Sequence, residues 1–100
     1  NMNKNRVGTL SEKRAICYFI EKGLDVFDSC QDTGTVDMIT FDPITGKTQC
    51  WEVKSENFRL SGPKKGCRIA RTRRNKKFTK IINMIYVDKN GKIREGKKRK

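Results

Sequence analysis

Two short segments of the chain, residues 36–41 and 48–54, intersperse β-branched and aromatic residues with polar ones. The residues between them include Asp-Pro and Thr-Gly-Lys, which favour a tight turn. This pattern predicts a β-hairpin. Because successive side chains on a strand point to opposite faces, we expect Trp51 and Val53 on one face and Cys50, Glu52 and Lys54 on the other.

A helical pattern precedes the hairpin. Residues 9–12 read Thr-Leu-Ser-Glu, which matches a capping box, so we expect a helix that begins at Thr9 and ends near Lys22, with Gly23 as its C-terminal stop. One stripe of this helix includes Ala15, Ile16, Phe19 and Ile20, and it also includes Glu12. A carboxylate is unusual in an apolar stripe. Considered with this helix alone, Glu12 is explained as a residue that caps the start of its own helix.

The rest of the pattern predicts a half-buried strand at residues 24–28, a short strand at 67–70, a basic helix at 71–80 and a buried strand at 81–87. Asn90-Gly91 predicts a final hairpin into residues 92–94. The predicted fold is therefore an α+β domain with a mixed sheet, in the order αβββαβ plus a small C-terminal hairpin. One hundred residues indicate a single domain, 1–100, with mobile basic ends at about 1–6 and 95–100.

The net charge is the compositional feature that says most about the function. Lysine and arginine total 24 against 11 acidic residues, a formal net charge of +13, which favours a polyanionic partner and nucleic acid above all. No apolar run approaches the roughly 20 residues of a spanning helix, and the N-terminal residues do not resemble a signal peptide, so we expect an intracellular protein that does not enter membranes. Candidate DNA contacts are the basic residues of the ends and loops: Lys4, Arg6, Lys64, Lys65, Arg68, Arg71, Arg73, Arg74, Lys76 and Lys77.

The four cysteines are expected to be free thiols in such a compartment. They are Cys17, Cys30, Cys50 and Cys67, and no two of them have the Cys-x-x-Cys spacing of a zinc site. The chain has no histidine that could complete a zinc ligand set.

Glu12, Asp37, Glu52 and Lys54 would come together if the first helix packs on the sheet. With a helical Glu, an Asp at the second strand and Glu-x-Lys on the third, the chain resembles nucleases of the PD-(D/E)XK superfamily. Residues 6–12 (Arg-x-Gly-x-x-x-Glu) and 32–37 (Asp-x-Gly-x-x-Asp) are most similar to archaeal-type Holliday junction resolvases and to small homing endonucleases of this fold. The resemblance implies a restriction-endonuclease-like core. Val36 stands where the motif's name has proline.

The resemblance also implies the chemistry, a Mg²⁺-dependent DNA endonuclease that leaves 5′-phosphate and 3′-hydroxyl ends. Asp37, Glu52 and the backbone carbonyl of Val53 are expected to hold Mg²⁺, for which Mn²⁺ would substitute. Lys54 is expected to act on the attacking water, and Glu12 to bind a second ion or its waters. Ser55 and Glu56 are candidates for supporting the site or approaching the DNA.

A homodimer or homotetramer is expected because one chain offers one site and double-strand cleavage needs two. A phage or another mobile element is a candidate source of such a protein. A homing-type enzyme and a junction resolvase stay open as alternatives.

Two readings compete with the nuclease. In the first, the chain is a noncatalytic nucleic-acid-binding module, with Glu52 and Lys54 as a same-face ion pair on an exposed strand. In the second, it is a ribosome-associated basic protein, suggested by charge alone.

Overall fold

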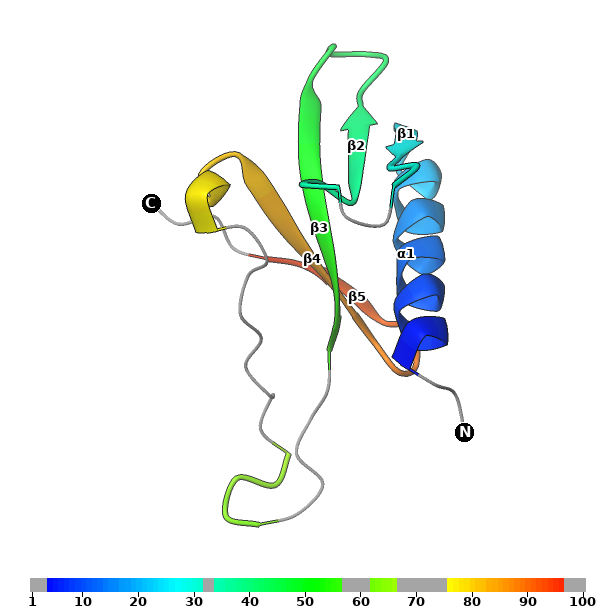
Figure 1. The fold of residues 1–100 in the computed structure, drawn as a ribbon. Coiled ribbons are helices and arrows are strands. Elements are labelled where there is room, and N and C mark those ends of the chain that lie inside the picture. Colours follow the sequence, from blue (N-terminus) through cyan, green and yellow to red (C-terminus); the bar gives the residue numbers. More distant parts are fainter. Residues whose placement is uncertain (1–3, 32–33, 57–61, 67–75, 97–100) are drawn as a thin grey trace.

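The computed structural model describes residues 4–31, 34–56, 62–66 and 76–96 of the chain. Within these residues a single α-helix, α1 (Lys4–Glu21), packs against a five-stranded sheet (Figure 1). The strands are β1 (Asp25–Asp28), β2 (Met38–Phe41), β3 (Thr48–Glu56), β4 (Ile82–Asp88) and β5 (Ile93–Glu95). The predicted α+β class with a mixed sheet is confirmed.

The strands lie in the order β1-β2-β3-β4-β5. Neighbours are antiparallel except β3 and β4, which run parallel with Cys50 opposite Ile82. Both predicted hairpins are present, β2 to β3 and β4 to β5. The first turn is closed by Asp42, whose carboxylate accepts hydrogen bonds from the N–H groups of Ile44 and Thr45. The bond from Ile44 contributes most to holding the pKa of Asp42 below its usual value.

The start of α1 differs from the prediction. The helix begins at Lys4, so Thr9 lies inside it, and its hydroxyl donates to the carbonyl of Asn5 at 3.0 Å. A threonine hydroxyl can bond the carbonyl four residues earlier, so the Thr-x-x-Glu pattern is compatible with a helix interior as well as a helix start. Lys4 and Arg6, expected in a mobile end, therefore belong to the first turns of α1.

The end of α1 confirms the prediction. Gly23 has a φ of 85°, and its N–H donates to the carbonyl of Ile20. The N–H of Leu24 donates to the carbonyl of Phe19, which completes a Schellman arrangement. Leu24 also packs against the core, so the helix stop and the entry into β1 are set by the same residues.

The core lies between α1 and the sheet. Ala15 and Phe19 of α1 pack with Met38 of β2, Trp51 of β3 and Ile85 of β4. The rings of Phe19 and Trp51 are 4.7 Å apart between centroids. The buried line of the helix runs through Ser11, Ala15 and Phe19, and it leaves Ile20 57% exposed, contrary to the predicted stripe.

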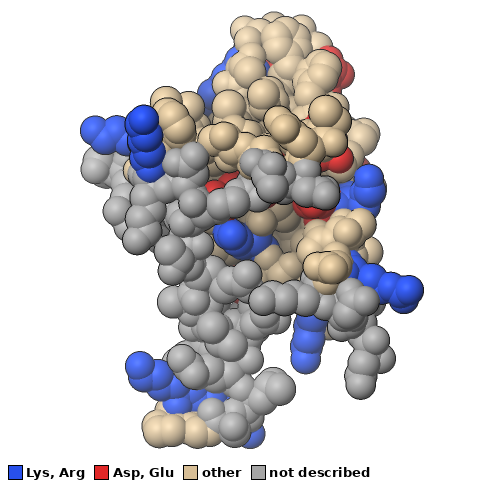
Figure 2. All heavy atoms as spheres, viewed as in Figure 1, with Lys and Arg blue, Asp and Glu red and all other residues tan. Residues whose placement is uncertain are grey.

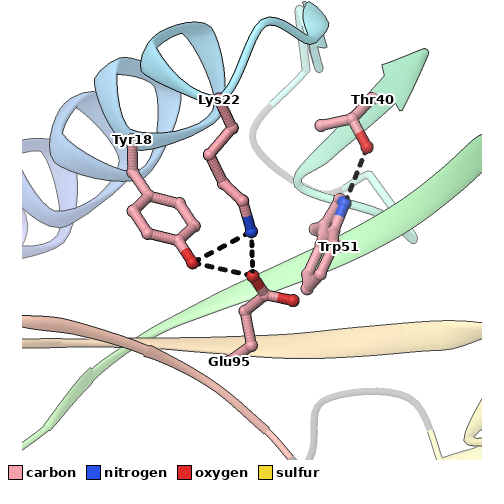
Figure 3. A network of polar contacts seen from close by, with 5 residues as sticks. All are labelled: Tyr18, Lys22, Thr40, Trp51 and Glu95. Carbon is pink, nitrogen blue, oxygen red and sulfur yellow. Dashed lines mark hydrogen bonds and ion pairs between the residues drawn. The ribbon is translucent and has the colours of Figure 1, made fainter. Parts of the chain in front are cut away.

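Polar contacts fasten the sheet and α1 together (Figure 3). The buried indole N–H of Trp51 donates to the hydroxyl of Thr40 at 2.9 Å. At the edge of the sheet formed by β5, Glu95 accepts hydrogen bonds from Tyr18 at 2.7 Å and from Lys22 at 2.8 Å. The last strand is thereby tied to the helix.

The predicted basic helix is wrong in its described part. Lys76–Phe78 forms a short 3₁₀ turn, η1, and residues 79–81 continue as a turn into β4. A block of adjacent lysines offers no apolar stripe to bury, so little favours a longer helix here. Residues 71–75 of that prediction and the strand expected at 67–70 lie outside the described residues. The described part of the chain contains no helix that is long and apolar enough to cross a membrane.

Candidate active site

The face of the sheet that points away from α1 carries the candidate residues. Met38 and Trp51 pack against Phe19 in the core, so the residues next to them in their strands point the other way. We call this other face the distal face. It carries Ile39 and Phe41 of β2 and the predicted series Cys50, Glu52 and Lys54 of β3.

Asp37 lies just before β2 and is held at three points. Its N–H donates to the carbonyl of Trp51 at 3.0 Å, and its carbonyl accepts from the N–H of Ser29 at 3.1 Å. Its Oδ2 accepts from the N–H of Val53 at 2.7 Å. Because Met38 lies opposite Trp51, the same register places Asp37 opposite Glu52. Sequence reasoning placed Asp37 beside the third strand, and the structure does so too.

The loop before Asp37 contains a support that sequence reasoning missed. The Ser29 hydroxyl donates to the carbonyl of Gln31 at 3.1 Å and lies close to Gly34. A Cβ atom built on Gly34 would be 2.6 Å from Ser29 Oγ, closer than real Cβ contacts allow. The serine directly after a predicted strand and the glycine five residues later were the available signals, but their contact depends on the folded loop.

Glu52 and Lys54 form an ion pair on the distal face. Glu52 Oε2 and Lys54 Nζ are 3.1 Å apart, and the two side chains are 1% and 18% exposed. The binding-module alternative predicted a pair on an exposed strand, whereas Glu52 is buried. Burying a carboxylate costs free energy even when it is paired, so an ordinary surface ion pair does not account for this position.

Glu12 lies on α1, half-buried, one residue after Ser11. The hydroxyls of Ser11 and Ser55 are 2.7 Å apart, which fixes this turn of the helix beside the end of β3. Glu12 follows about 100° further around the helix. Among the described residues, no three His, Cys, Asp or Glu side chains gather closely enough to hold a metal ion. The structure therefore brings Asp37, Glu52 and Lys54 together but does not join Glu12 to them in a three-ligand group.

Ser55 and Glu56 make contacts within the protein. Ser55 bonds Ser11, and the buried Glu56 pairs with Arg94 of β5 at 2.6 Å. The Arg94 guanidinium in turn lies 4.1 Å from the centroid of the Tyr86 ring. These contacts join the C-terminal end of β3 to α1 and to β5.

The candidate DNA contacts are spread over the molecule. Arg6, Lys64, Lys65 and Lys77 are exposed, and Figure 2 shows basic side chains projecting around the outline of the molecule. Lys64 and Lys65 belong to the described segment 62–66, which projects away from the sheet in Figure 1. Lys4 and Lys76 lie in α1 and η1; Arg68, Arg71, Arg73 and Arg74 lie outside the described residues.

The donor set suits a hard cation that retains water. Mg²⁺ is commonly held by one or two carboxylates together with waters and substrate phosphate, rather than by a complete protein cage. Asp37 and Glu52 supply two carboxylates across the β2–β3 pair. The carbonyl of Val53 leaves the strand on the same side as its N–H, which is the side of Asp37.

Comparisons with known proteins show a similarity in fold. No family model matches the chain, and no curated protein matches it. A solved structure of a bacterial homing endonuclease, I-Ssp6803I, is similar in fold, with a TM-score of 0.74 and 15% sequence identity. The match covers 98% of this chain and 67% of that chain. At this identity the similarity concerns the fold.

Proposed function

We propose that the protein is a Mg²⁺-dependent DNA endonuclease. The observation that carries the proposal is the position of Asp37 opposite the buried Glu52, with Lys54 3.1 Å from Glu52 on the same face. The fold similarity to a homing endonuclease supports it, as does the net charge of +13.

Asp37, Glu52 and the Val53 carbonyl would hold the ion. When bound, Mg²⁺ would offset charge on the scissile phosphate and acidify a water molecule at neutral pH. The N–H of Val53 keeps the Asp37 carboxylate oriented through its 2.7 Å hydrogen bond, so this ligand is preorganised by the β2–β3 pairing. Glu12 would act on a second ion or its waters from the flank of α1.

Lys54 would orient or deprotonate the attacking water and offset negative charge in the transition state. Its pairing with Glu52 restrains the ammonium group on the distal face before substrate arrives. The products would carry 5′-phosphate and 3′-hydroxyl ends. The DNA substrate would be a duplex site cut by a homing-type enzyme or a four-way junction, and two or four copies would cut both strands.

The test is cleavage of plasmid and of four-way junction DNA with Mg²⁺, Mn²⁺ or EDTA. Wild type is compared with Asp37→Asn and Lys54→Ala. Asp28→Asn and Lys22→Ala are matched controls, because they make the same changes at exposed positions, one in β1 and one directly after α1. We expect metal-dependent cleavage that both site variants lose and both controls keep, with DNA binding retained throughout.

Other results would contradict the proposal. Binding without cleavage in every protein, indifferent to metal, would support the noncatalytic module. Cleavage that survives Asp37→Asn would place the reaction elsewhere. Preference for the junction over a linear duplex would identify a resolvase, and preference for one duplex sequence a homing-type enzyme.

A further inference from the structure

The distal face carries an arginine beside the candidate site that has no part in the proposed chemistry. Tyr86 of β4 lies opposite Lys54 of β3, and Arg94 of β5 lies opposite Tyr86, so the three residues form one row across the sheet. Residues that lie opposite each other in a sheet share a face, so Tyr86 and Arg94 are on the distal face with Lys54. Ile93, the residue before Arg94, packs against the core on the other face, in agreement with this placement.

The guanidinium group of Arg94 is held in a fixed orientation. Its Nη2 and Nε donate to Glu56 Oε2 at 2.6 and 3.1 Å. Its Cζ lies 4.1 Å from the centroid of the Tyr86 ring, within cation–π range. A Cβ atom built on Gly96 would be 3.2 Å from Tyr86 Cε2, so this glycine lets the ring lie close to the end of β5. An arginine restrained in this way loses little conformational freedom when it binds a ligand.

Part of the Arg94 guanidinium group is left for a ligand. Glu56 occupies its Nε–Nη2 edge, and within the described part of the chain Nη1 makes no hydrogen bond. The Arg94 side chain is 38% exposed, whereas the Glu56 side chain is 8% exposed. The remaining N–H groups of Nη1 and Nη2 form a planar fork of the kind that binds two phosphate oxygens at once.

The two halves of the distal face differ in the charge that they offer to DNA. Residues 24–46, which include β1 and β2, contain five acidic residues and no lysine or arginine. DNA binds chiefly through lysine and arginine contacts to phosphate, so the β1–β2 half disfavours a DNA strand and Arg94 favours one over β4 and β5. Asp88, the acidic residue of β4, accepts hydrogen bonds from the N–H groups of Asn90 and Lys92, so its carboxylate is engaged in the turn before β5.

We infer that Arg94 binds a backbone phosphate of the DNA strand that occupies the candidate site, where this strand crosses β4 and β5. Glu56 and Tyr86 are positioning residues for Arg94. Two steps between neighbouring strands separate Lys54 from Arg94, roughly 10 Å, which is the rise of about three nucleotides along a duplex. The inference deepens the proposed function and rests on it for the place of the DNA strand.

The experiment is a titration of a fluorescently labelled DNA duplex of arbitrary sequence with the full chain, followed by anisotropy in EDTA at several salt concentrations. Arg94→Gln is compared with Glu56→Gln, the other half of the same ion pair. We expect Arg94→Gln to raise the dissociation constant about fivefold to tenfold and to reduce the slope of log K against log salt by about 0.9. Glu56→Gln should bind as tightly as wild type or more tightly, because it removes a negative charge beside the phosphate.

A matched control tests whether any paired cation of β5 would give this result. Lys22→Gln removes the cation that pairs with Glu95, the residue after Arg94, on the opposite face of the sheet. Its dissociation constant should stay within about twofold of the wild-type value, because no DNA strand runs over that face.

A purely structural ion pair predicts a different pattern. If the pair only fastens β5 to β3, losing either half has the same effect, so equal weakening of DNA binding by Arg94→Gln and Glu56→Gln would overturn the inference. Unchanged binding in both variants would overturn it too. The double variant Glu56→Gln/Arg94→Gln leaves no unpaired buried carboxylate and should bind DNA as weakly as Arg94→Gln. The fluorescence of Trp51, the chain's one tryptophan, reports whether each variant keeps its core.

Two variants of Tyr86 test its positioning role. Tyr86→Phe keeps the ring and should bind DNA like wild type, whereas Tyr86→Leu should raise the dissociation constant about threefold. Equal weakening by both would exclude the ring contact as the support of Arg94.

The inference and the proposed function can fail separately, because binding is measured without metal. DNA binding that depends on Arg94, with no cleavage of any DNA in Mg²⁺, would overturn only the proposed function. Metal-dependent cleavage that Asp37→Asn abolishes, together with DNA binding that is indifferent to Arg94→Gln, would overturn only the inference.

Discussion

The molecule contains two carboxylate–lysine pairs of similar length in different surroundings. Glu52 and Lys54 are 3.1 Å apart on the distal face, with side chains 1% and 18% exposed. Lys22 and Glu95 are 2.8 Å apart between α1 and β5, with side chains 49% and 37% exposed (Figure 3). Distance alone does not distinguish them, and burial does.

The exposed pair is explained by structure alone. Glu95 accepts from both Tyr18 and Lys22, so it fastens the last strand to the helix, and solvent screens the gain. Burial of the Glu52 carboxylate costs desolvation free energy that an exposed ion pair avoids. Glu52 also lies opposite Asp37, a second carboxylate. A costly arrangement next to another acidic group is typical of a site that binds a cation or does chemistry.

The largest difference is expected from neutralising each carboxylate. Glu52→Gln removes a proposed metal ligand, so cleavage should fall by about 10²-fold to 10³-fold or more, while Glu95→Gln should leave it unchanged. The free energy of unfolding of Glu52→Gln should change by less than about 1 kcal/mol, because the variant also removes a buried charge. Cleavage rates and urea unfolding measure the two effects. Equal loss of cleavage in both variants would erase the distinction.

Truncating each lysine tests the same distinction through stability. Lys54→Ala leaves the buried Glu52 without this cation and should cost about 1–3 kcal/mol of unfolding free energy, together with loss of cleavage. Lys22→Ala should cost less than about 1 kcal/mol and leave cleavage intact. Urea unfolding followed by Trp51 fluorescence provides the comparison. A larger stability loss from Lys22→Ala would show that burial is not the deciding factor.

The support of Asp37 should produce a smaller, more specific effect. Gly34→Ala places a Cβ 2.6 Å from Ser29 Oγ, so the Ser29 side chain or the loop must move, and Ser29 is the residue whose N–H donates to the Asp37 carbonyl. We expect the Mg²⁺ concentration for half-maximal cleavage to rise about tenfold. The matched control is Gly8→Ala, where the added Cβ meets nothing within 4 Å. Adding Ser29→Ala to Gly34→Ala should recover part of the loss, and an absence of any change in metal dependence would exclude this support role.

The smallest effect is expected from the pH dependence of the exposed pair. For Glu95 burial opposes ionisation, but hydrogen bonds from Lys22 and Tyr18 outweigh it and lower the pKa of Glu95 from 4.5. The hydrogen bond with Glu95 is the main reason that the pKa of Lys22 is raised from 10.5. The ion pair therefore stabilises the folded protein at pH values between 4.5 and 10.5, the ordinary pKa values of Glu95 and Lys22. It is lost as pH falls through the lowered pKa of Glu95, and as pH rises through the raised pKa of Lys22.

Thermal unfolding across pH measures this contribution. Wild type should exceed Glu95→Gln by about 0.5 kcal/mol near neutral pH, and the difference should vanish as pH falls through the lowered pKa of Glu95. A difference that persists in acid would mean that Glu95 acts through packing. Burial raises the pKa of the Tyr18 phenol, with the Glu95 hydrogen bond adding to it, so alkaline unfolding should also respond to this variant.

Local patterns of residues determined much of the fold and of the site. The alternation around Trp51 placed Glu52 and Lys54 together, because side chains two residues apart on a strand share a face whatever packs on it. The Asp-Pro and Asn-Gly turns and the Gly23 helix stop depend on backbone preferences of a few adjacent residues, and all were predicted.

Tertiary structure decided what depends on distant residues. The parallel pairing of β3 with β4, the burial of Glu52 and the contact of Ser29 with Gly34 arise from groups that meet only after folding. The start of α1 was mispredicted, because the pattern around Thr9 fits a helix interior and a helix start equally well. Of the predicted apolar stripe, Ala15, Ile16 and Phe19 pack in the core and Ile20 stays exposed. Glu12 shows the same division: its helix was predictable, but its distance from Asp37 and Glu52 depends on how α1 docks on the sheet.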